Sequence, residues 1–397
     1  MKNVSLVSHD VCSGCGTCSN VCPKSCISMV RDAEGFAYPS VDEQKCIECG
    51  ACLKKCPVEK ERASGGTPIF SVVLQDKDGE SLKNSTSGGA FACIARYVLK
   101  QGGVVFGAAY DELLNVSHVA VERLEDLHLL QGSKYVSSDM KDSYKKVKFF
   151  FNSGRLVLFS GTPCQVAALK SFLGEDSKLL LTMDLVCHGV PSQKLLQKYI
   201  HWLGEKNLST IKSYVFRSKK FFGWSLGGAF SDEKKSYAVN PDCDPYYAAF
   251  LRGETFRKSC YSCKFANMNR EGDFTVGDFW GFHNMKDPVG FDHTKGLSML
   301  LVNSPKGENV LKQIESDAVI VPMDLQTISA GNWNLYHPSV YKPIRDEIYA
   351  NIDLPFEELQ KRYLHHEDPF MYYVRRLRRR LLPQGLRDAL KKILGRA

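Results

Sequence analysis

The chain has 397 residues, of which 44% are hydrophobic and 24% charged, and it contains 15 cysteines. These fractions are typical of a globular protein, and no run of about 18 apolar residues is present, so we expect no membrane-spanning segment. The net charge of +8 arises almost entirely from residues 375–397, which hold nine Lys or Arg and one acid, so we expect no general nucleic-acid surface.

Eight cysteines near the N-terminus form two runs of C-x2-C-x2-C-x3-C-P, the pattern of bacterial-type ferredoxins. Three closely spaced thiolates suit three corners of a cubane, and the fourth cysteine of each run crosses to the other cluster. Glycines between the cysteines permit positive φ, and a proline after each run redirects the chain. The predicted ligands of two 4Fe-4S clusters are Cys12, Cys15, Cys18 and Cys56 for one, and Cys46, Cys49, Cys52 and Cys22 for the other.

Two other uses of these thiols fit less well. A zinc ribbon would leave four of them idle, and a disulfide framework suits a small secreted chain. The N-terminus also lacks the layout of a signal peptide, so we predict a two-cluster ferredoxin-type domain over residues 1–62 and a reducing, cytoplasmic location. Cys26 fits neither run, and we expect it to pack as a small buried residue. We expect Cys93 to be a helix core residue and Cys243 a loop residue, neither of them binding metal.

After a polar, Gly-rich linker that follows Cys56, the pattern alternates between strands and helices. Apolar runs predict strands at 70–76, 104–110, 156–160 and 179–186, and helical patterns lie between or after them at 89–99, 143–152, 165–172 and 193–203. This alternation predicts an α/β sheet that is at least partly parallel.

From about residue 210 the pattern becomes more β-like with long loops, followed by a strand over 298–304 and a helix over 307–316. Residues 319–350 carry no clear pattern. The expected fold class is mixed α+β and α/β: a ferredoxin-like domain, an α/β body with parts 69–205 and 206–350, and a basic tail, 351–397. The residue pattern of the tail predicts one helix, a break at Pro383, and a second helix with an apolar stripe beside basic residues.

Four later cysteines lie in settings that suit metal or redox chemistry. Cys164 follows a predicted strand and opens a helix, where backbone N–H groups favour a thiolate, and Cys187 ends an apolar strand. Cys260 and Cys263 form a C-x2-C pair. The four could supply the corners of a third cubane, but the spacing also fits buried bystanders, a redox-active pair or half a zinc site.

Five stretches, in order, resemble the family of coenzyme F-420 hydrogenase/dehydrogenase beta subunits, and the resemblance covers about residues 1–300. They are KNSTSGGAF (83–91), QGSKYVSSD (131–139), LFSGTPCQVAAL (158–169), DLVCHGVPS (184–192) and CYSCKFANMNREGDFTVGDFWG (260–281). Members of that family are iron-sulfur flavoproteins that carry FAD. The resemblance implies that the body is a flavoprotein and that a third 4Fe-4S cluster near the flavin is held by Cys164, Cys187, Cys260 and Cys263.

The same stretches contain residues that suit a flavin, which needs backbone donors for its pyrophosphate and positive charge near its ring. The expected cofactor-binding residues are Ser85, Ser87, Gly88, Gly89, Lys134, Tyr135, Arg270 and Asp278. Plainer alternatives stay open: a helix N-cap for the serine and glycine loop, surface positions for the basic residues and the tyrosine, and core packing for the aromatics at 279–280.

The expected catalytic residues are His188 and Lys134. His188 would relay a proton or, alternatively, donate a hydrogen bond to the neighbouring cluster, and Lys134 would supply charge beside the flavin. No G-x-G-x-x-G follows a predicted strand, so the sequence does not support a Rossmann-type NAD site.

The resemblance implies a ferredoxin or another electron-transfer protein as one partner and a small two-electron acceptor as the other. The acceptor is the 5-deazaflavin coenzyme in methanogen enzymes and differs in chlorophyll-related reductases; in bacteria without that coenzyme, a small metabolite or a precursor of surface polysaccharide is implied. The alternative is a non-enzymatic electron-transfer subunit that serves a partner enzyme. The basic tail lies outside the resemblance and fits a peripheral membrane contact, an acidic partner or a solvated end.

Overall fold

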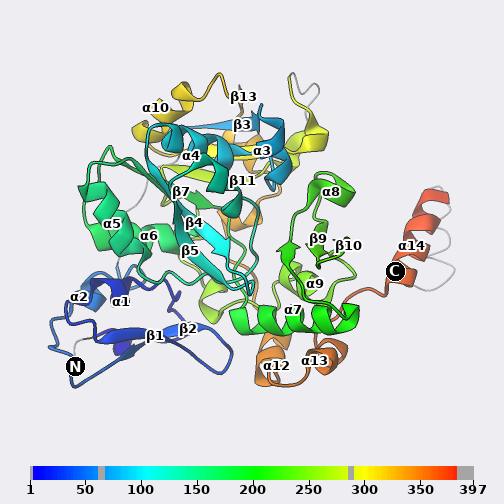
Figure 1. The fold of residues 1–397 in the computed structure, drawn as a ribbon, viewed down its shortest axis with the longest axis horizontal. Helices are drawn as coiled ribbons and strands as arrows, with labels where there is room; N and C mark the ends of the chain where they lie inside the picture. Colours follow the sequence, from blue (N-terminus) through cyan, green and yellow to red (C-terminus); the bar gives the residue numbers. More distant parts are fainter. Residues whose placement is uncertain (1–2, 61–67, 285–289, 382–397) are drawn as a thin grey trace.

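The computed structural model describes residues 3–60, 68–284 and 290–381, and residues 3–60 form a small N-terminal module (Figure 1). Its elements are η1 (Val4–Leu6), α1 (Thr17–Val21), the antiparallel strands β1 (Ile27–Arg31) and β2 (Ala37–Val41), and α2 (Ala51–Lys54). Both helices begin after a glycine with positive φ, 73° at Gly16 and 68° at Gly50. Residues with a Cβ rarely adopt this conformation, so the role predicted for these glycines is confirmed.

An eight-stranded mixed sheet forms the body, in the order β13-β3-β12-β11-β7-β6-β4-β5. The central strands β11, β7, β6 and β4 run parallel, and the flanking strands pair antiparallel. The strands are β3 (Phe70–Asp76), β4 (Val104–Tyr110), β5 (Val116–Val121), β6 (Val157–Gly161), β7 (Leu180–Leu185), β11 (Phe274–Asp278), β12 (Ser298–Val302) and β13 (Ala318–Pro322). The predicted partly parallel sheet is confirmed.

Helices cover both faces of this sheet. Successive residues of a strand point to opposite faces, so neighbouring residues of one strand pack against different helices. Val105 packs with α4 and α10, whereas Val104 and Phe106 pack with α5 and α6. The helices around the sheet are α3 (Gly79–Asn84), α4 (Ala90–Lys100), α5 (Ser143–Asn152), α6 (Pro163–Leu173), α10 (Pro305–Gln313) and α11 (Leu325–Ser329). The connections contain the short turns η2 (Leu124–Leu129), η3 (Lys258–Cys260), η4 (Trp280–Asn284), η5 (His293–Lys295) and η6 (Trp333–Leu335).

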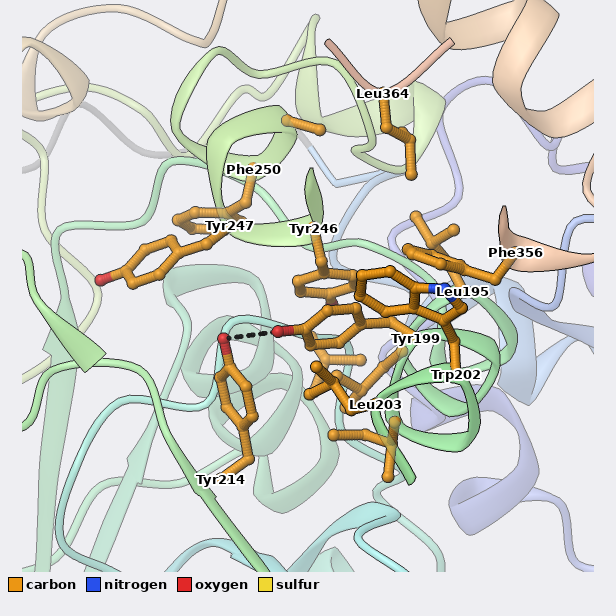
Figure 2. Packing of buried hydrophobic residues seen from close by; sticks show 14 of the residues in the cluster. Leu195, Tyr199, Trp202, Leu203, Tyr214, Tyr246, Tyr247, Phe250, Phe356 and Leu364 are labelled. Carbon is orange, nitrogen blue, oxygen red and sulfur yellow. Dashed lines mark hydrogen bonds between the residues drawn. The ribbon is translucent and has the colours of Figure 1, made fainter. Parts of the chain in front are cut away.

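A second, aromatic core lies beside the large sheet and is shown in Figure 2. Tyr199 stacks on Tyr246 with ring centroids 5.2 Å apart, and its hydroxyl donates to that of Tyr214 at 3.2 Å. The elements around this core are α7 (Gln193–Asn207), the three-stranded sheet of β8 (Ser213–Val215), β9 (Gly228–Ser231) and β10 (Ser236–Val239), and helices α9 (Pro245–Leu251), α12 (Ile344–Ala350) and α13 (Phe356–Arg362). The short helix α8 (Lys219–Phe222) lies in the connection between β8 and β9 and has no buried residue.

The predicted elements and the observed ones agree best in the buried centre. The strands over 70–76 and 104–110 and the helix over 143–152 have the predicted bounds. The sequence reading missed β5, β13 and α3, and α11, η6 and α12 occupy most of the stretch left without a prediction. Strands from both sides of residue 205 share the large sheet, so the two expected parts of the body are interleaved.

The first predicted tail helix is observed as α14 (Pro369–Leu381), which projects to the right of the body in Figure 1. The second helix, predicted after Pro383, lies outside the described residues, as does most of the linker predicted after Cys56. Within the described ranges, no helix is long and apolar enough to cross a membrane.

An ion pair buried at one end joins the N-terminal module to the body. Arg345 of α12 is fully buried and donates from Nη1 to Oε1 of Glu34 at 2.7 Å and to Asp346 at 3.0 Å. Its Nε donates to the carbonyl of Phe256 at 3.0 Å. Removing Glu34 would leave the guanidinium charge inadequately compensated, and a buried charge without its partner is strongly destabilising.

We therefore expect Glu34→Ala to destabilise the assembled chain by about 3 kcal/mol. The matched control is Glu358→Ala, which removes the exposed pair that Glu358 forms with Arg362 at 3.1 Å and should cost about 0.3 kcal/mol. Anaerobic urea titrations followed by circular dichroism measure both losses. Equal losses in the two variants would contradict this reading of the contact.

Candidate functional site

The structure brings together the thiols of each predicted cluster. One pocket is lined by Cys12, Cys15, Cys18 and Cys56. A second pocket is lined by Cys22, Cys46, Cys49 and Cys52. In both pockets the fourth cysteine comes from the opposite run, which is the crossed arrangement expected from the spacing.

The chemistry of both pockets fits an iron-sulfur cluster. Burial raises the pKa of Cys56 to about 11, and the neighbouring Cys15 and Cys12 thiols contribute to the rise. Thiolates that lie this close repel one another, so their deprotonated form requires a cationic partner, which an iron core supplies. Among the described residues, no three His, Cys, Asp or Glu side chains form a group that could hold a single metal ion.

Cys26 is buried, as predicted, but it also lines the second pocket. Its Sγ lies 3.3 Å from Sγ of Cys22, and its backbone N–H donates to that sulfur at 3.4 Å. Hydrogen bonds to cluster sulfurs are among the features that set reduction potentials. Sequence spacing alone did not indicate this contact. Cys93 is buried within α4, and Cys243 is a half-buried residue of the loop before α9.

The four later cysteines converge at one edge of the large sheet. β6 and β7 are adjacent parallel strands, so Cys164, at the start of α6, and Cys187, just after β7, lie at the same edge. Burial raises the pKa of Cys164 well above its usual value, and the nearby Cys263 and Cys187 thiols raise it further. Burial raises the pKa of Cys260 to about 12, with Cys263 contributing. The structure thus groups the four thiols expected to hold a third cluster.

This third thiol group lies next to the first pocket. The thiol of Cys15 is among the groups that raise the pKa of Cys164, after burial and the nearer thiols. The hydroxyl of Tyr144, on α5, donates to the carbonyl of Cys15 at 2.9 Å, and the carbonyl oxygen of Gln165 lies 3.3 Å from the same hydroxyl. Tyr144 therefore fixes the ferredoxin-type loop against the helix that carries Cys164.

Arg270 holds this site together. Its side chain and that of Asp184, at the end of β7, are buried and form an ion pair at 2.9 Å. Asp184 also accepts from the backbone N–H groups of Glu271 and Gly272. The remaining donors of Arg270 bind Thr275 Oγ1 and the carbonyls of Phe265, Asn267 and Leu185. All five N–H groups have acceptors in the protein, so Arg270 clamps the loop after Cys263 to β7. The charge or stacking that Arg270 was expected to offer a flavin stays a prediction.

The loops expected to bind a flavin lie side by side. Gln131 donates to Ser85 Oγ at 3.1 Å, and the backbone N–H of Ser133 donates to Thr86 Oγ1 at 3.0 Å. Ser87 donates to the carbonyl of Leu297 at 2.5 Å. The segments around residues 85–89 and 131–135 therefore form one surface beside β12.

Gly88 and Gly89, in the loop of residues 85–89, allow the backbone to adopt its conformation and to pack closely within the protein. A Cβ on Gly88 would lie 2.2 Å from the carbonyl oxygen of Leu74 and 2.4 Å from the nitrogen of Ser298, which are neighbouring strand residues. Gly89 has φ of 84° and is the N-cap of α4. The N-cap alternative is thus observed, and the close approach that requires glycine at 88 is to the sheet. The cofactor-binding role expected for Gly88 and Gly89 stays a prediction.

Asp278 lies at the centre of a charged and aromatic group that the sequence reading did not identify. Its carboxylate accepts from Arg217 at 2.8 Å and from Nε1 of Trp224 at 3.0 Å. Trp224 is stacked on Trp280 with ring centroids 5.5 Å apart. Lys219 is electrostatically close to this carboxylate. The signal available in the sequence was the run of basic and aromatic residues at 217–224, in the connection between β8 and β9.

Lys219 places a cation next to the loop of residues 85–89. Its Nζ donates to the carbonyls of Leu82 at 2.7 Å and Ser87 at 2.6 Å, and it finds no third acceptor among the described residues. Burial lowers its pKa to about 8, with Asp278 acting in the opposite direction. One ammonium N–H and the positive charge are therefore available to an anionic ligand below pH 8.

The other predicted residues surround the same region. Burial lowers the pKa of His188, which follows Cys187 and interacts electrostatically with Asp278 and Arg217. Tyr135 stacks on Phe250 with centroids 4.1 Å apart. Lys134 donates to the carbonyls of its own loop at positions 129 and 131, and burial lowers its pKa to about 7.

An unsatisfied polar atom lies near Lys134. Its Nζ lies 5.9 Å from the ring centroid of Tyr110, whose buried hydroxyl has no hydrogen-bond partner among the described residues. A buried unsatisfied hydroxyl is uncommon in proteins and is accounted for if a ligand or water binds it. Cations, stacked indoles and an unsatisfied phenol are groups that fit a flavin nucleotide.

Comparisons with known proteins agree with this organisation. A family model that describes the C terminus of the beta subunit of coenzyme F420 hydrogenase/dehydrogenase matches residues 154–327, and a 4Fe-4S dicluster domain model matches residues 11–60. The F subunit of F(420)H(2) dehydrogenase from Methanosarcina mazei is 24% identical over 275 residues, which are 63% of this chain and 76% of that protein. The I subunit of NADH-quinone oxidoreductase from Pelobacter propionicus is 35% identical over 68 residues, 15% of this chain and 36% of that protein.

A solved structure of the F420-reducing NiFe hydrogenase complex from Methanosarcina barkeri contains a chain with 16% identity and a TM-score of 0.46, covering 78% of this chain and 99% of that one. The sequence matches place the two cysteine runs in a dicluster model, and Cys164, Cys187, Cys260 and Cys263 in the other. Over residues 154–327 the chain is thus similar to the beta subunits of coenzyme F420 hydrogenase/dehydrogenase, and it carries a 4Fe-4S dicluster domain over residues 11–60, near its N-terminus.

Proposed function

We propose that the chain is an iron-sulfur flavoprotein oxidoreductase that holds three 4Fe-4S clusters and FAD and exchanges electrons between a ferredoxin-type protein and a two-electron carrier. The observation that carries this proposal is the convergence of Cys164, Cys187, Cys260 and Cys263 between the first cysteine pocket and the Asp278 group. When bound, clusters carry single electrons and FAD exchanges electrons singly or in pairs.

The residues of the chain have separate tasks in this proposal. The eight module cysteines hold two clusters near a surface where Cys49 is exposed to a protein partner. Tyr144 fixes the distance from this module to the third thiol group, and Arg270 fixes the loop that carries half of that group. Lys219 and Asp278 would orient the flavin, with Ser85, Ser87, Lys134 and Tyr135 forming the adjoining wall.

The two-electron carrier is proposed from the family. The relative in Methanosarcina mazei carries F(420)H(2) dehydrogenase in its name, which favours the 5-deazaflavin coenzyme as the first acceptor to test. A small bacterial metabolite or a polysaccharide precursor is the next class. His188 lies beside the thiol group and the Asp278 group and remains the proposed proton relay.

The first test combines metal content with turnover. Anaerobically reconstituted wild-type protein should contain about twelve irons and one FAD, and reduced ferredoxin should drive reduction of an acceptor such as the deazaflavin coenzyme. Cys263→Ser should lose about four irons and the acceptor activity, while its module clusters still accept electrons. The control Cys243→Ser alters a half-buried cysteine outside the group and should behave as wild type.

Two outcomes would change the proposal. Wild-type protein with eight irons and no bound flavin would contradict both the third cluster and the flavoprotein assignment. Full cofactor content with acceptor reduction only after a second protein is added would instead support the electron-transfer subunit.

The second test concerns Lys219. Its ammonium is charged below its pKa of about 8 and neutral above it, so FAD should bind wild-type protein more weakly as pH rises through 8. Lys219→Met should bind FAD about tenfold more weakly at pH 7, with little further change up to pH 9, because a charge-assisted hydrogen bond is lost. Quenching of FAD fluorescence measures the dissociation constant. Lys220→Met, at the exposed neighbouring position, is the control, and unchanged affinity in Lys219→Met would exclude Lys219 from the site.

We also propose an anionic lipid surface as a partner of α14. Phe370, Tyr373 and Leu377 lie on one face by helical spacing and are 73%, 65% and 58% exposed. The helix contains five arginines and no acid. An apolar stripe with aromatic residues beside clustered arginines is the composition of helices that lie in the membrane interface.

The third test uses vesicle flotation. Wild-type protein should float with vesicles that contain phosphatidylglycerol and not with vesicles of phosphatidylcholine alone. Phe370→Ser combined with Leu377→Ser should abolish flotation, because the apolar anchor is lost. Leu208→Ser, which removes a leucine that is 92% exposed elsewhere, should still float. If wild-type protein fails to float and instead binds ferredoxin through α14, the surface is a protein-docking site.

A further inference from the structure

Arg257 is a buried cation that lies between the first cysteine pocket and the third thiol group. It directly precedes η3, which ends at Cys260, and it is only 2% exposed. Its Nη1 approaches the carbonyl of Cys12 at 3.5 Å, and its Nη2 donates to the carbonyl of Ala37 at 3.1 Å. One side chain of the body thus reaches into the N-terminal module beside a predicted cluster ligand.

The surroundings of Arg257 hold the guanidinium tightly but do not neutralise it. It lies over the rings of Phe36, at 4.8 Å, and Tyr38, at 4.5 Å. Within the described ranges it forms no ion pair, and its Nε has no hydrogen-bond partner. The nearby carboxylate of Glu34 is paired with Arg345. Aromatic faces offset part of the cost of burying a charge, but a full compensating anion is missing from the protein side chains.

The thiols on either side are the groups that could supply this anion. Nη1 of Arg257 approaches the carbonyl of Cys12 at 3.5 Å, and the backbone N–H of Cys260 donates to the carbonyl of Arg257 at 2.9 Å. These two cysteines belong to different thiol groups, one in the module and one in the body. A single guanidinium is therefore within electrostatic reach of both.

We propose that Arg257 is a positioning residue shared by two iron-sulfur sites, where its buried charge balances the thiolates around Cys12 and Cys260 and makes both sites easier to reduce. This inference rests on the three-cluster arrangement of the proposed function. Each added electron makes a cluster more negative, and a nearby cation in a medium of low dielectric constant stabilises that form. The distal site of Cys22, Cys46, Cys49 and Cys52 lies outside this pair and serves as an internal reference.

Arginine is the suitable residue for this position. Its planar guanidinium stays charged and stacks on aromatic rings, which lysine does less well. Space for it depends on Gly14 of the module, because a Cβ there would lie 2.5 Å from Nη2 of Arg257. A purely mechanical role, in which Arg257 only ties the module to the body through two carbonyls, is the competing explanation.

The test is a redox titration of the fully assembled protein, followed by electron paramagnetic resonance. Arg257→Met should lower the electron affinity of both flanking clusters at least tenfold, about 59 mV for a one-electron couple, and leave the distal cluster unchanged. Arg257→Lys keeps the charge and should retain potentials near those of wild type. Lys258→Met removes an adjacent charge whose side chain is 45% exposed, so solvent screening should leave all three potentials nearly unchanged.

The results distinguish an electrostatic effect of Arg257 on the clusters from a purely structural role in attaching the module to the body. Unchanged potentials in Arg257→Met, or equal falls in Arg257→Lys or Lys258→Met, would overturn the proposal. If Arg257→Met loses its clusters and Arg257→Lys assembles normally, the requirement for charge is supported; if both lose them, the role is mechanical. An iron content of about eight in wild-type protein would refute the third cluster, and the potential of the Cys12 site would still report on Arg257.

Discussion

The position of the Tyr144 hydroxyl is the constraint on which the rest of this structure depends. It donates to the carbonyl of Cys15, in the N-terminal module, and also lies 3.3 Å from the carbonyl of Gln165, one residue after Cys164. Redox sites communicate only when they are held close together, and two domains connected by a linker alone would not be held. Because Tyr144 is fully buried and both carbonyls belong to the backbone, the module and the body are fixed as one unit at the point where their thiols meet.

The parallel centre of the large sheet explains why distant segments supply one site. Strands β6, β7 and β11 run in the same direction, so the residues that follow them emerge at one edge. Cys164 and Cys187 follow the first two strands, and Asp278 ends the third. The Asp184 and Arg270 pair then draws the loop after Cys263 to this edge. The thiol group and the charged group beside it are therefore a direct result of strand order.

Much of this organisation could be predicted from the sequence, because the informative patterns are local. Cysteine spacing predicted the two module groups, including the exchange of Cys22 and Cys56, and apolar runs predicted the central strands. The edge strands β5 and β13 were missed. Ser117 and His118 interrupt the apolar run of β5, and the residues of β13 are mostly only half-buried, so neither strand has a continuous buried apolar pattern. Contacts between residues far apart in the chain could not be predicted. Nothing near Arg270 in the sequence indicates Asp184 as its acceptor, and nothing near Gly88 indicates its close approach to Leu74 and Ser298.

The contact between Gly14 and Arg257 links two positions that are far apart in the chain. Any side chain at residue 14 would collide with the guanidinium, and a smaller residue at 257 would leave a cavity above the rings of Phe36 and Tyr38. Homologous chains should therefore change these two positions together during evolution, or neither of them. Exchange of the ferredoxin-type module between relatives by recombination would succeed only when donor and recipient share this matched pair.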